Sequence, residues 1–586
     1  MPPRDWVIAP TDEAVARGFA EGLGISPVTA RVLAGRGIRS IGEAKAFLRP
    51  TLTQMHEPDV MADIDRAAAR ILEAVEKSER IVVYGDYDAD GLCATALMVS
   101  FLRLLGAEPG AYIPNRLEQV YGLHPESVEE IAAAGCDLVV TVDCGVTAID
   151  EAKMLAERGI DLVVTDHHQP ADVLPSAAAV VDPNRRDCPY PFGGISGAGV
   201  AYKVAWAIAK QAAGGGKIPE RTRSFLLEGL ALVAIGTVAD VVDLCDENRA
   251  IVSFGLDKLG STGLPGLKAL MKAAGVKRGT LSSTDIAFKI APRLNAAGRV
   301  GDPHRALDLL LTDDDAEAAR LADELDRCNR ERRAIQARVL DQARAMAAGL
   351  AGESVGAGVD EMPPAIVLAS EEWHFGVIGI VAGQLAREFH RPVVLIALEG
   401  GRGRGSARSI EGFALHEALA GCRDLLVRFG GHAMAAGLTI EEADLEAFTE
   451  RLVRIAGEAL AEKSLRPSIR IDAICPLAEV SHALVRELGK LGPFGSGNPE
   501  PVVATGAVRL VGEVRLMGST GRHVSFMAAN GSCSFRAVGF GMGHRVRELD
   551  KLSGGYIEIA HRPGINEFRG ARSVELYVED VRAAEH

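Results

Sequence analysis

The sequence predicts a multidomain α/β protein with a parallel-sheet domain, a long connecting helix, a smaller α/β domain and a C-terminal β-barrel of the OB type. Three observations carry this prediction. The chain of 586 residues is too long for one hydrophobic core. Short Val-rich stretches alternate with helical segments in its first half, which is typical of parallel sheets. After Arg466 the pattern changes to short alternating segments, which is typical of a barrel.

The N-terminal segment, residues 1–60, contains short helical patterns without recognisable chemistry. The parallel-sheet domain is predicted for residues 61–310, where three segments run from an apolar strand into acidic residues: RIVVYGDYDADG (80–91), DLVVTVDCGV (137–146) and DLVVTDHHQP (161–170). Ligands of such sheets bind outside the carboxyl ends of the strands, so we expect the acidic ends to meet at one edge. A fourth apolar run, LALVAIGTVADVVDL (230–244), is predicted to bring Asp240 to the same edge.

The remaining elements follow in chain order. Residues 311–347 form a strongly helical pattern with Thr312 as the predicted N-cap, and we expect this helix to connect two domains. The second α/β domain is predicted for residues 362–462. It contains strands at 364–370 and 392–398, and a loop at GGRGRGSARS (400–409). The barrel is predicted for residues 466–582.

Charge and cysteine usage limit the class of protein. A net charge of −15 argues against nucleic-acid binding when taken alone, but cations bound among acidic residues reverse the local field. The nine cysteines contain no CxxC pair, so neither a zinc framework nor a secreted disulfide scaffold is expected. No signal peptide and no membrane-spanning apolar run are visible, and we expect a cytoplasmic protein that binds no membrane.

The acidic clusters are the candidate site. Its candidate ligands are Asp86, Asp88, Asp90, Asp143, His167 and Asp240. The first three alternate in sequence and would share one side of an extended segment. Hard oxygen donors with one imidazole suit Mg²⁺ or Mn²⁺, and so many acids stay ionised together only around cations, which favours two ions. For Asp143 or Asp240 taken alone, a helix N-cap would be the better explanation, but four clusters at four predicted strand ends argue for a site.

Four motifs resemble those of the DHH phosphoesterase superfamily: GDYDADG (85–91), VTVDCGV (140–146), VTDHH (164–168) and GTVADVVDL (236–244). GGHAMAAG (430–437) resembles the signature of the DHHA1 domain, and PFGSGNPEP (493–501) before the barrel is similar to the RecJ family of that superfamily. The resemblance implies a 5′→3′ exonuclease of single-stranded DNA, active in repair and recombination. It also implies two-metal hydrolysis that releases 5′-mononucleotides.

The resemblance assigns roles to individual residues. The implied ligands of two Mn²⁺ or Mg²⁺ ions are Asp88, Asp90, Asp143, His167 and Asp240, with Asp143 as the bridge. His168 would contact the scissile phosphate, and Asp166 would orient a ring. Members of the superfamily often carry a His where this chain has Tyr84. Asp86 therefore either replaces that ligand or supports the site.

Five residues are expected to hold the strand: Arg116, Arg299, Ser406, Arg408 and His432. The resemblance implies that Ser406 and Arg408 clamp a terminal 5′-phosphate, and that His432 lies near the same cleft. Arg402 and Arg404 suit a phosphate or belong to a flexible basic turn. The Gly-rich helix start at 195–206 either cradles a phosphate or allows tight helix packing, and packing is favoured.

Two other functions remain open. A phosphodiesterase of short oligonucleotides or cyclic dinucleotides would share the metal site, but it has no need of a barrel. A non-catalytic DNA-binding scaffold would be marked by degenerate motifs, whereas here only the position of Tyr84 departs from the pattern. The resemblance further implies a monomer that acts on single-stranded DNA, with a single-strand-binding protein and a repair helicase as partners.

Overall fold

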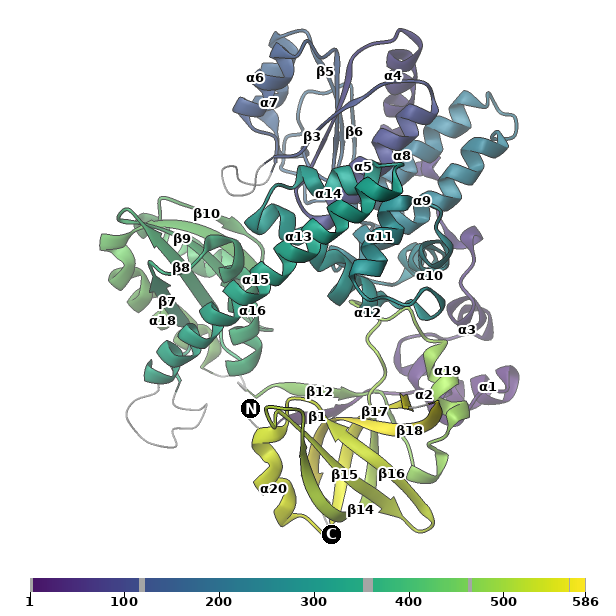
Figure 1. Cartoon of the computed structure of the whole chain (residues 1–586), viewed down its shortest axis with the longest axis vertical. Coiled ribbons are helices and arrows are strands. Elements are labelled where there is room, and N and C mark those ends of the chain that lie inside the picture. The colour runs from purple at the N-terminus through teal and green to yellow at the C-terminus, as the bar shows by residue number, and fades with distance from the viewer. Residues whose placement is uncertain (1–3, 115–121, 351–361, 462–465, 569, 585–586) are drawn as a thin grey trace. The chain divides into compact units, whose positions relative to one another are not determined.

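The computed structural model describes residues 4–114, 122–350, 362–461, 466–568 and 570–584 (Figure 1). These residues fall into two compact units. The first unit contains residues 52–466, and the second combines residues 4–51 with residues 467–584. The second unit is therefore built from two segments that lie far apart in the sequence.

The first unit contains a five-stranded parallel sheet with the order β3-β2-β4-β5-β6, which confirms the predicted fold class. Its strands are β2 (Ile81–Gly85), β3 (Gly110–Tyr112), β4 (Leu138–Val142), β5 (Asp161–Thr165) and β6 (Ala179–Val181). On one face pack α4 (Ile64–Glu76), α5 (Ala89–Leu104) and α8 (Gly197–Ala212); on the other lie α6 (Pro125–Ala133) and α7 (Ile149–Glu157). The motifs quoted above follow the carboxyl ends of β2, β4 and β5.

The fourth apolar run is a helix, so the prediction that it ends a strand is wrong. Residues 230–239 form the second half of α9 (Glu220–Ala239), and Asp240 is its C-cap. The run is buried nearly all round and shows no helical period, so its pattern does not separate a buried helix from a buried strand. Among the described helices, α9 alone is long and apolar enough to cross a membrane, but most of its apolar stretch is buried inside the unit.

Further helices complete this part of the unit. They are α10 (Asp246–Ser261), α11 (Pro265–Ala273), α12 (Ser283–Asp285), α13 (Ala291–Val300), α14 (His304–Leu311) and α15 (Asp315–Leu350). The long helix α15 was predicted with Thr312 as its N-cap, which is wrong. Thr312 is the C-cap of α14. At the start of α15, the carboxylate of Asp314 accepts a hydrogen bond from the Glu317 N–H at 2.7 Å.

A second sheet with the order β10-β11-β9-β8-β7 forms the smaller α/β part of the first unit. Its strands are β7 (Ile366–Ser370), β8 (Val393–Glu399), β9 (Arg402–Arg408), β10 (Arg428–Gly431) and β11 (Ala435–Glu441). The helices beside it are α16 (Phe375–Phe389), α17 (Leu415–Ala420) and α18 (Leu445–Leu460).

Strand β9 was predicted as a loop, and its glycines explain the error. Gly403 and Gly405 face the core. An added β-carbon would lie 2.6 Å from Cγ2 of Ile396 at the first position and 2.7 Å from Cδ1 of Leu438 at the second. Only glycine allows this close approach, and glycine also weakens the strand signal in the sequence.

The second unit contains a closed five-stranded barrel, which confirms the predicted OB-type domain. The barrel strands are β14 (Val503–Met517), β15 (His523–Asn530), β16 (Cys533–Gly539), β17 (Tyr556–Phe568) and β18 (Ala571–Ala583). Antiparallel pairing of β14 with β17 and parallel pairing of β16 with β18 close it. The short helix α20 (Val546–Lys551) connects β16 to β17.

Residues 4–51 share a core with this barrel. Strand β1 (Asp5–Ile8) pairs in parallel with β12 (Ser468–Ile471). The helices of the segment are α1 (Glu13–Leu23), α2 (Pro27–Gly35) and α3 (Ile41–Leu48). Phe19 and Leu33 are buried in the same apolar cluster as Leu510 of the barrel. The segment is thus a structural component of the second unit.

Candidate metal centre

The loop after β2 supplies three carboxylates. Asp86 follows the strand, Asp88 is the N-cap of α5, and Asp90 lies in the first turn of that helix. The Asp88 carboxylate accepts hydrogen bonds from the N–H groups of Asp90 (2.9 Å) and Gly91 (3.1 Å). The predicted extended segment is therefore wrong, because Asp88 starts a helix at Ala89. The turn, and not strand alternation, brings the three acids to one place.

Asp90 lies against the N-terminus of α8. Its two oxygens accept hydrogen bonds from the N–H groups of Gly197 (2.7 Å) and Ala198 (3.0 Å). The Gly-rich helix start at 195–206 therefore binds a carboxylate of the protein itself. Burial, followed by the charge of Asp88, raises the pKa of Asp90 to about 7.

Two helical glycines allow the carboxylates to approach the helices. A β-carbon added to Gly197 would lie 2.2 Å from Oδ1 of Asp143. A β-carbon added to Gly236 in α9 would lie 2.2 Å from Oδ1 of Asp90. Neither position has room for a methyl group, so both glycines are required by the packing of the acids.

The loop after β5 holds the two histidines through Asp166. One carboxylate oxygen accepts hydrogen bonds from the N–H groups of His167 (2.7 Å) and His168 (3.1 Å), and it lies 2.8 Å from Nδ1 of His168. The other oxygen accepts from the Val146 N–H at 2.9 Å. Burial opposes the charge on the His168 ring, but the hydrogen bond and charge of Asp166 outweigh it and raise the pKa of His168 to about 9.

His167 points into the cluster. Its Nε2 is buried and makes no hydrogen bond to any residue that the structure describes. It lies 3.1 Å from Oδ1 of Asp143 and 3.7 Å from Oδ2 of Asp240. Burial, followed by the nearby charge of His168, lowers the pKa of His167 to about 4, so the ring is neutral at neutral pH and offers a lone pair.

The donor set fits divalent cations. Ligand atoms of Asp90, His167 and Asp240 lie within 4.8 Å of one another, as do those of Asp86, Asp88 and Asp143. Burial and the charges of neighbouring Asp residues raise the pKa of Asp240 to about 8 and the pKa of Asp143 well above its ordinary value. Buried acids that repel one another, beside a neutral imidazole, are stabilised by positive ions of the Mg²⁺ or Mn²⁺ type.

Tyr84 is not part of this centre. Its hydroxyl donates a hydrogen bond to the carbonyl of Gly122 at 2.9 Å, and its ring stacks on Tyr112 with the ring centres 5.2 Å apart. Both rings belong to the core cluster on the α6–α7 face of the sheet. The position where relatives often carry a His is therefore turned away from the acids, whereas Asp86 lies among them.

The residues predicted to hold the strand lie on several elements. Ser406 and Arg408 share one face of β9, and Arg408 Nη1 donates to Oγ of Ser406 at 3.2 Å. Arg299 lies in the last turn of α13 and donates to the carbonyl of Gly376 at 2.9 Å. His432 is exposed in the turn between β10 and β11. Arg116 lies outside the described residues.

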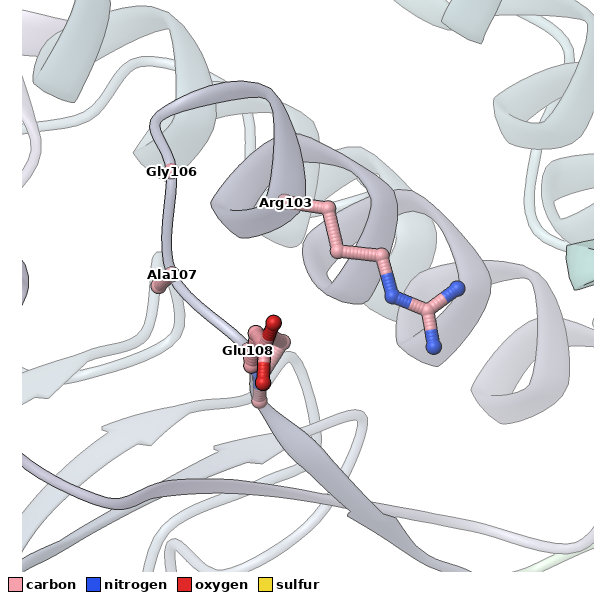
Figure 2. Close-up of a pocket in the computed structure, with 5 residues that line it drawn as sticks. Arg103, Gly106, Ala107 and Glu108 are labelled. Carbon is pink, nitrogen blue, oxygen red and sulfur yellow. The ribbon is translucent and has the colours of Figure 1, made fainter.

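The first unit also has a hollow that lies away from the metal centre. It has a volume of about 510 Å³ and is lined by Arg103, Gly106, Ala107, Glu108 and Pro109. Figure 2 shows Arg103 on the end of α5 and Glu108 on the segment that leads into β3. That segment precedes a parallel strand, so the hollow lies at the amino-terminal edge of the sheet, opposite the acids.

Some residues of the site were not predicted from the sequence. Gly236 is one of them, although glycine inside a helical pattern costs about 0.5–1 kcal/mol and so signals a close approach, whereas Gly197 lies in the Gly-rich helix start for which close packing was favoured. Asn184 is another: its Nδ2 donates to the carbonyl of His167 at 2.6 Å. The Oδ1 of Asn295 accepts from the Ala89 N–H at 2.7 Å. No local pattern marks Asn184. Asn295 lies in APRLNAAGRV (291–300), where it was a candidate phosphate contact beside the favoured Arg299, and its contact with the metal-binding loop was not predicted.

Three family models match the chain. They are the DHH family, N-terminal domain, at residues 80–237, the DHHA1 domain at residues 363–458 and the RecJ OB domain at residues 471–580.

Similar proteins cover nearly the whole chain. The single-stranded-DNA-specific exonuclease RecJ of Bacillus subtilis (strain 168) is 37% identical over 583 residues, which cover 99% of this chain and 71% of that protein. The crystal structure of RecJ in complex with Mn²⁺ from Thermus thermophilus matches with a TM-score of 0.82 at 34% identity, and the match covers 99% of this chain and 80% of that one. The structure in complex with Mg²⁺ from the same organism matches with a TM-score of 0.74 at 31% identity and covers 99% and 79%.

Proposed function

This chain belongs to the RecJ family of DHH phosphoesterases, and on that premise we propose how its site acts on a DNA strand. The protein is a metal-dependent exonuclease specific for single-stranded DNA. The observation that carries this function is the convergence of acids and imidazoles at the carboxyl edge of the parallel sheet. Within it, we propose 5′→3′ polarity, release of 5′-mononucleotides, and a role in DNA repair and recombination.

The metal ions are Mn²⁺ or Mg²⁺. The proposed ligands are Asp88, Asp90, Asp143, His167 and Asp240, with Asp143 between the two ions. Two such ions, when bound, supply Lewis acidity at the phosphate and lower the pKa of water. We propose that Asp86 replaces the ligand that other members provide at the position of Tyr84, because Asp86 lies in one cluster with Asp88 and Asp143.

His168 and Asp166 complete the chemistry. In the protein without bound ions, the pKa of His168 is raised to about 9, and the protonated ring can donate from Nε2 to a phosphate oxygen that becomes more negative during attack. Asp166 fixes the ring through Nδ1 and thereby presents Nε2 in one orientation. We propose that His168 contacts the scissile phosphate and that Asp166 positions it.

The 5′ end is held by the second α/β part. Ser406 and Arg408 offer a hydroxyl and a guanidinium fork two residues apart on β9, which suits a terminal phosphate. Arg299, Arg116 and His432 are proposed to contact phosphates of the same strand. A clamp that needs a free 5′-phosphate explains both the polarity and the requirement for a strand end.

The barrel supplies the remaining contacts with the DNA strand. OB-type barrels bind single strands through phosphate contacts and base stacking, without reading sequence. A single-strand-binding protein and a repair helicase are the proposed protein partners, and a cytoplasmic monomer is the proposed working form.

The test is digestion of a single-stranded oligonucleotide labelled at its 3′ end, with Mn²⁺ or with EDTA. We expect shortening that requires the metal, releases mononucleotides and stops when the 5′ end is blocked. Asp143→Asn should lose both metal binding and cleavage, whereas Asp172→Asn, at a side chain that is 84% exposed, should keep both.

Three results would contradict the proposal in different ways. Shortening that ignores a 5′ block would remove the clamp and the polarity. Cleavage of dinucleotides but not of longer strands would identify a small-substrate phosphodiesterase. Binding of DNA without cleavage of any substrate would identify a scaffold.

A further inference from the structure

Helix α13 contacts the metal-binding loop. Oδ1 of Asn295 accepts a hydrogen bond from the Ala89 N–H at 2.7 Å, and Ala89 stands between Asp88 and Asp90 in the chain. One turn later, a β-carbon added to Gly298 would lie 3.0 Å from the carbonyl oxygen of Tyr87. The loop that carries three carboxylates therefore rests directly on α13.

The same helix contacts α16 at its other end. Arg299 Nη1 donates to the carbonyl of Gly376 at 2.9 Å. A β-carbon added to Gly376 would lie 2.5 Å from the carbonyl oxygen of Arg299. The backbones of α13 and α16 thus touch at a point where only glycine fits.

Helix α16 in turn contacts the proposed 5′-phosphate clamp. A β-carbon added to Gly379 would lie 2.7 Å from Oγ of Ser406 and 3.2 Å from Nη2 of Arg408. Gly376 and Gly379 are three residues apart and share one face of the helix. The face that touches α13 is therefore the face that touches the clamp.

These contacts form a short rigid connection between the metal centre and the clamp. Asn295 and Arg299 are four residues apart on α13, which separates them by about 6 Å along the helix. Gly376 and Gly379 add about 4.5 Å along α16. Every step lies within a helix or in direct contact between helices and strand β9.

An exonuclease that holds the 5′ end cuts the bond that lies at the metal ions. The number of nucleotides between the clamp and the ions then decides the product length. We propose that α13 is the spacer that sets this length to one nucleotide, with Asn295 and Gly376 as its two positioning contacts. The inference rests on the proposed function, and in particular on a 5′-phosphate bound by Ser406 and Arg408.

The variants Gly376→Ala and Asn295→Ala test the two ends of the spacer. The first inserts a methyl group between α13 and α16, and the second removes the bond to the metal-binding loop. Gly383→Ala is the matched control on the same helix, because its β-carbon would meet only Cγ of Arg408 at an ordinary 3.7 Å. All three are assayed in the full chain with Mn²⁺ on a 5′-phosphorylated and a 5′-hydroxyl oligonucleotide of the same sequence, with products separated by length.

We expect wild type and Gly383→Ala to release mononucleotides alone. In the two spacer variants, mononucleotide release from the 5′-phosphorylated strand should fall about 100-fold, because a displacement of about 1 Å has that effect on positioned groups, whereas release from the 5′-hydroxyl strand, which the clamp does not hold, should stay within about threefold of wild type. Both spacer variants are assayed at saturating Mn²⁺, so that a weaker metal site cannot by itself account for the fall.

A fall of equal size on both oligonucleotides, in both spacer variants, would overturn the inference and leave the proposed function intact. No release of nucleotides by the wild type would instead overturn the proposed function. Thermal melting shows whether each variant is folded. If Gly376→Ala does not fold, Asn295→Ala decides the question, because it removes one hydrogen bond and adds no atoms.

Discussion

The α-carbon of Gly197 faces the carboxylate of Asp143 so closely that a β-carbon there would lie 2.2 Å from Oδ1. Gly197→Ala should therefore displace Asp143 and weaken Mn²⁺ binding by about 10–100-fold, as loss of a supporting contact does at other metal sites. Isothermal titration with Mn²⁺ measures the change.

The matched control is Gly18→Ala in α1, where a β-carbon would meet nothing within 4 Å. This substitution should leave Mn²⁺ affinity unchanged and raise stability by about 0.5–1 kcal/mol, because alanine is the better helix former. Equal Mn²⁺ affinity in Gly197→Ala and wild type would show that Asp143 does not need its observed position.

Metal binding should depend on pH because the acids bind protons when the ions are absent. The pKa of Asp90 is raised to about 7 and that of Asp240 to about 8. A group with a raised carboxyl pKa stabilises the metal-free fold at low pH and loses that contribution as the pH rises through the folded value. Between pH 6 and 9, the metal-free protein should therefore become less stable and bind Mn²⁺ more tightly.

Melting curves in EDTA and in Mn²⁺ measure this directly. The difference between the two melting temperatures should widen from pH 6 to about pH 8 and then level off. A difference that stays constant across this range would mean that these acids are already ionised without metal.

Asp166→Asn should destabilise the protein, because it removes the negative charge that pairs with the protonated ring of His168. The folded pKa of His168, about 9, lies above its ordinary value of 6.5, so the pair stabilises the fold fully below pH 6.5 and loses its effect as the pH rises through 9. The loss in Asp166→Asn should be about 2 kcal/mol near pH 6, since the His168 side chain is 33% exposed and solvent screens part of the pair.

The check is the melting temperature of the metal-free variant at pH 6 and pH 9.5, where the deficit should be smaller at the higher pH. Asp172→Asn breaks an ion pair with Arg186 that is 84–89% exposed, and it should change stability by less than about 0.5 kcal/mol at either pH. A stability deficit of Asp166→Asn that grows with pH would show that the His168 ring is not the positively charged partner of Asp166.

Arg408→Ala should remove the preference for 5′-phosphorylated ends. A hydrogen bond to a charged group contributes about 1.5–3 kcal/mol, so the ratio of kcat/KM between 5′-phosphate and 5′-hydroxyl substrates should fall about 10–100-fold. Arg402 lies on the same face of β9 and is paired with Glu441 at 2.6 Å, which makes Arg402→Ala the control. If Arg402→Ala alone lowers the ratio, the clamp is assigned to the wrong end of β9.

Val241 directly follows Asp240 and has a φ of 65°, a conformation that strains a β-branched side chain. Its side chain is 67% exposed, so glycine removes little contact. Strain of about 1–3 kcal/mol outweighs the added entropy of the unfolded chain, about 0.4–1 kcal/mol, and Val241→Gly should stabilise the protein by about 1 kcal/mol. Val173 is 63% exposed and has no positive φ, so Val173→Gly should destabilise the protein. Similar melting temperatures for both variants would contradict the strain.

The sequence predicts the strands that carry the site better than it predicts the residues that hold the site in place. Strands β2, β4 and β5 are recognisable because buried Val-rich runs end in acids, and parallel topology then brings those acids to one edge. Asp240 reaches the same place from the end of a helix, which a uniformly apolar run could not reveal. The contacts of Gly197 and Asn295 join segments far apart in the chain, and such tertiary contacts leave no local pattern.

Backbone conformation accounts for the other errors. Asp88 starts a helix where alternating acids suggest an extended segment, because capping depends on the direction in which the chain leaves the strand. The glycines of strand β9 weaken its sequence signal, and they are required because the side chains of Ile396 and Leu438 approach closely across the sheet.

The pairing of β1 with β12 has a consequence for biosynthesis. Residues 5–8 leave the ribosome early, but their partner strand emerges only after the whole first unit has been translated. Until then Phe19 and Leu33 have no barrel to cover them. Before the barrel is made, the N-terminal segment therefore lacks the partner that buries these side chains, and a chain that ends before the barrel would leave them exposed to proteases.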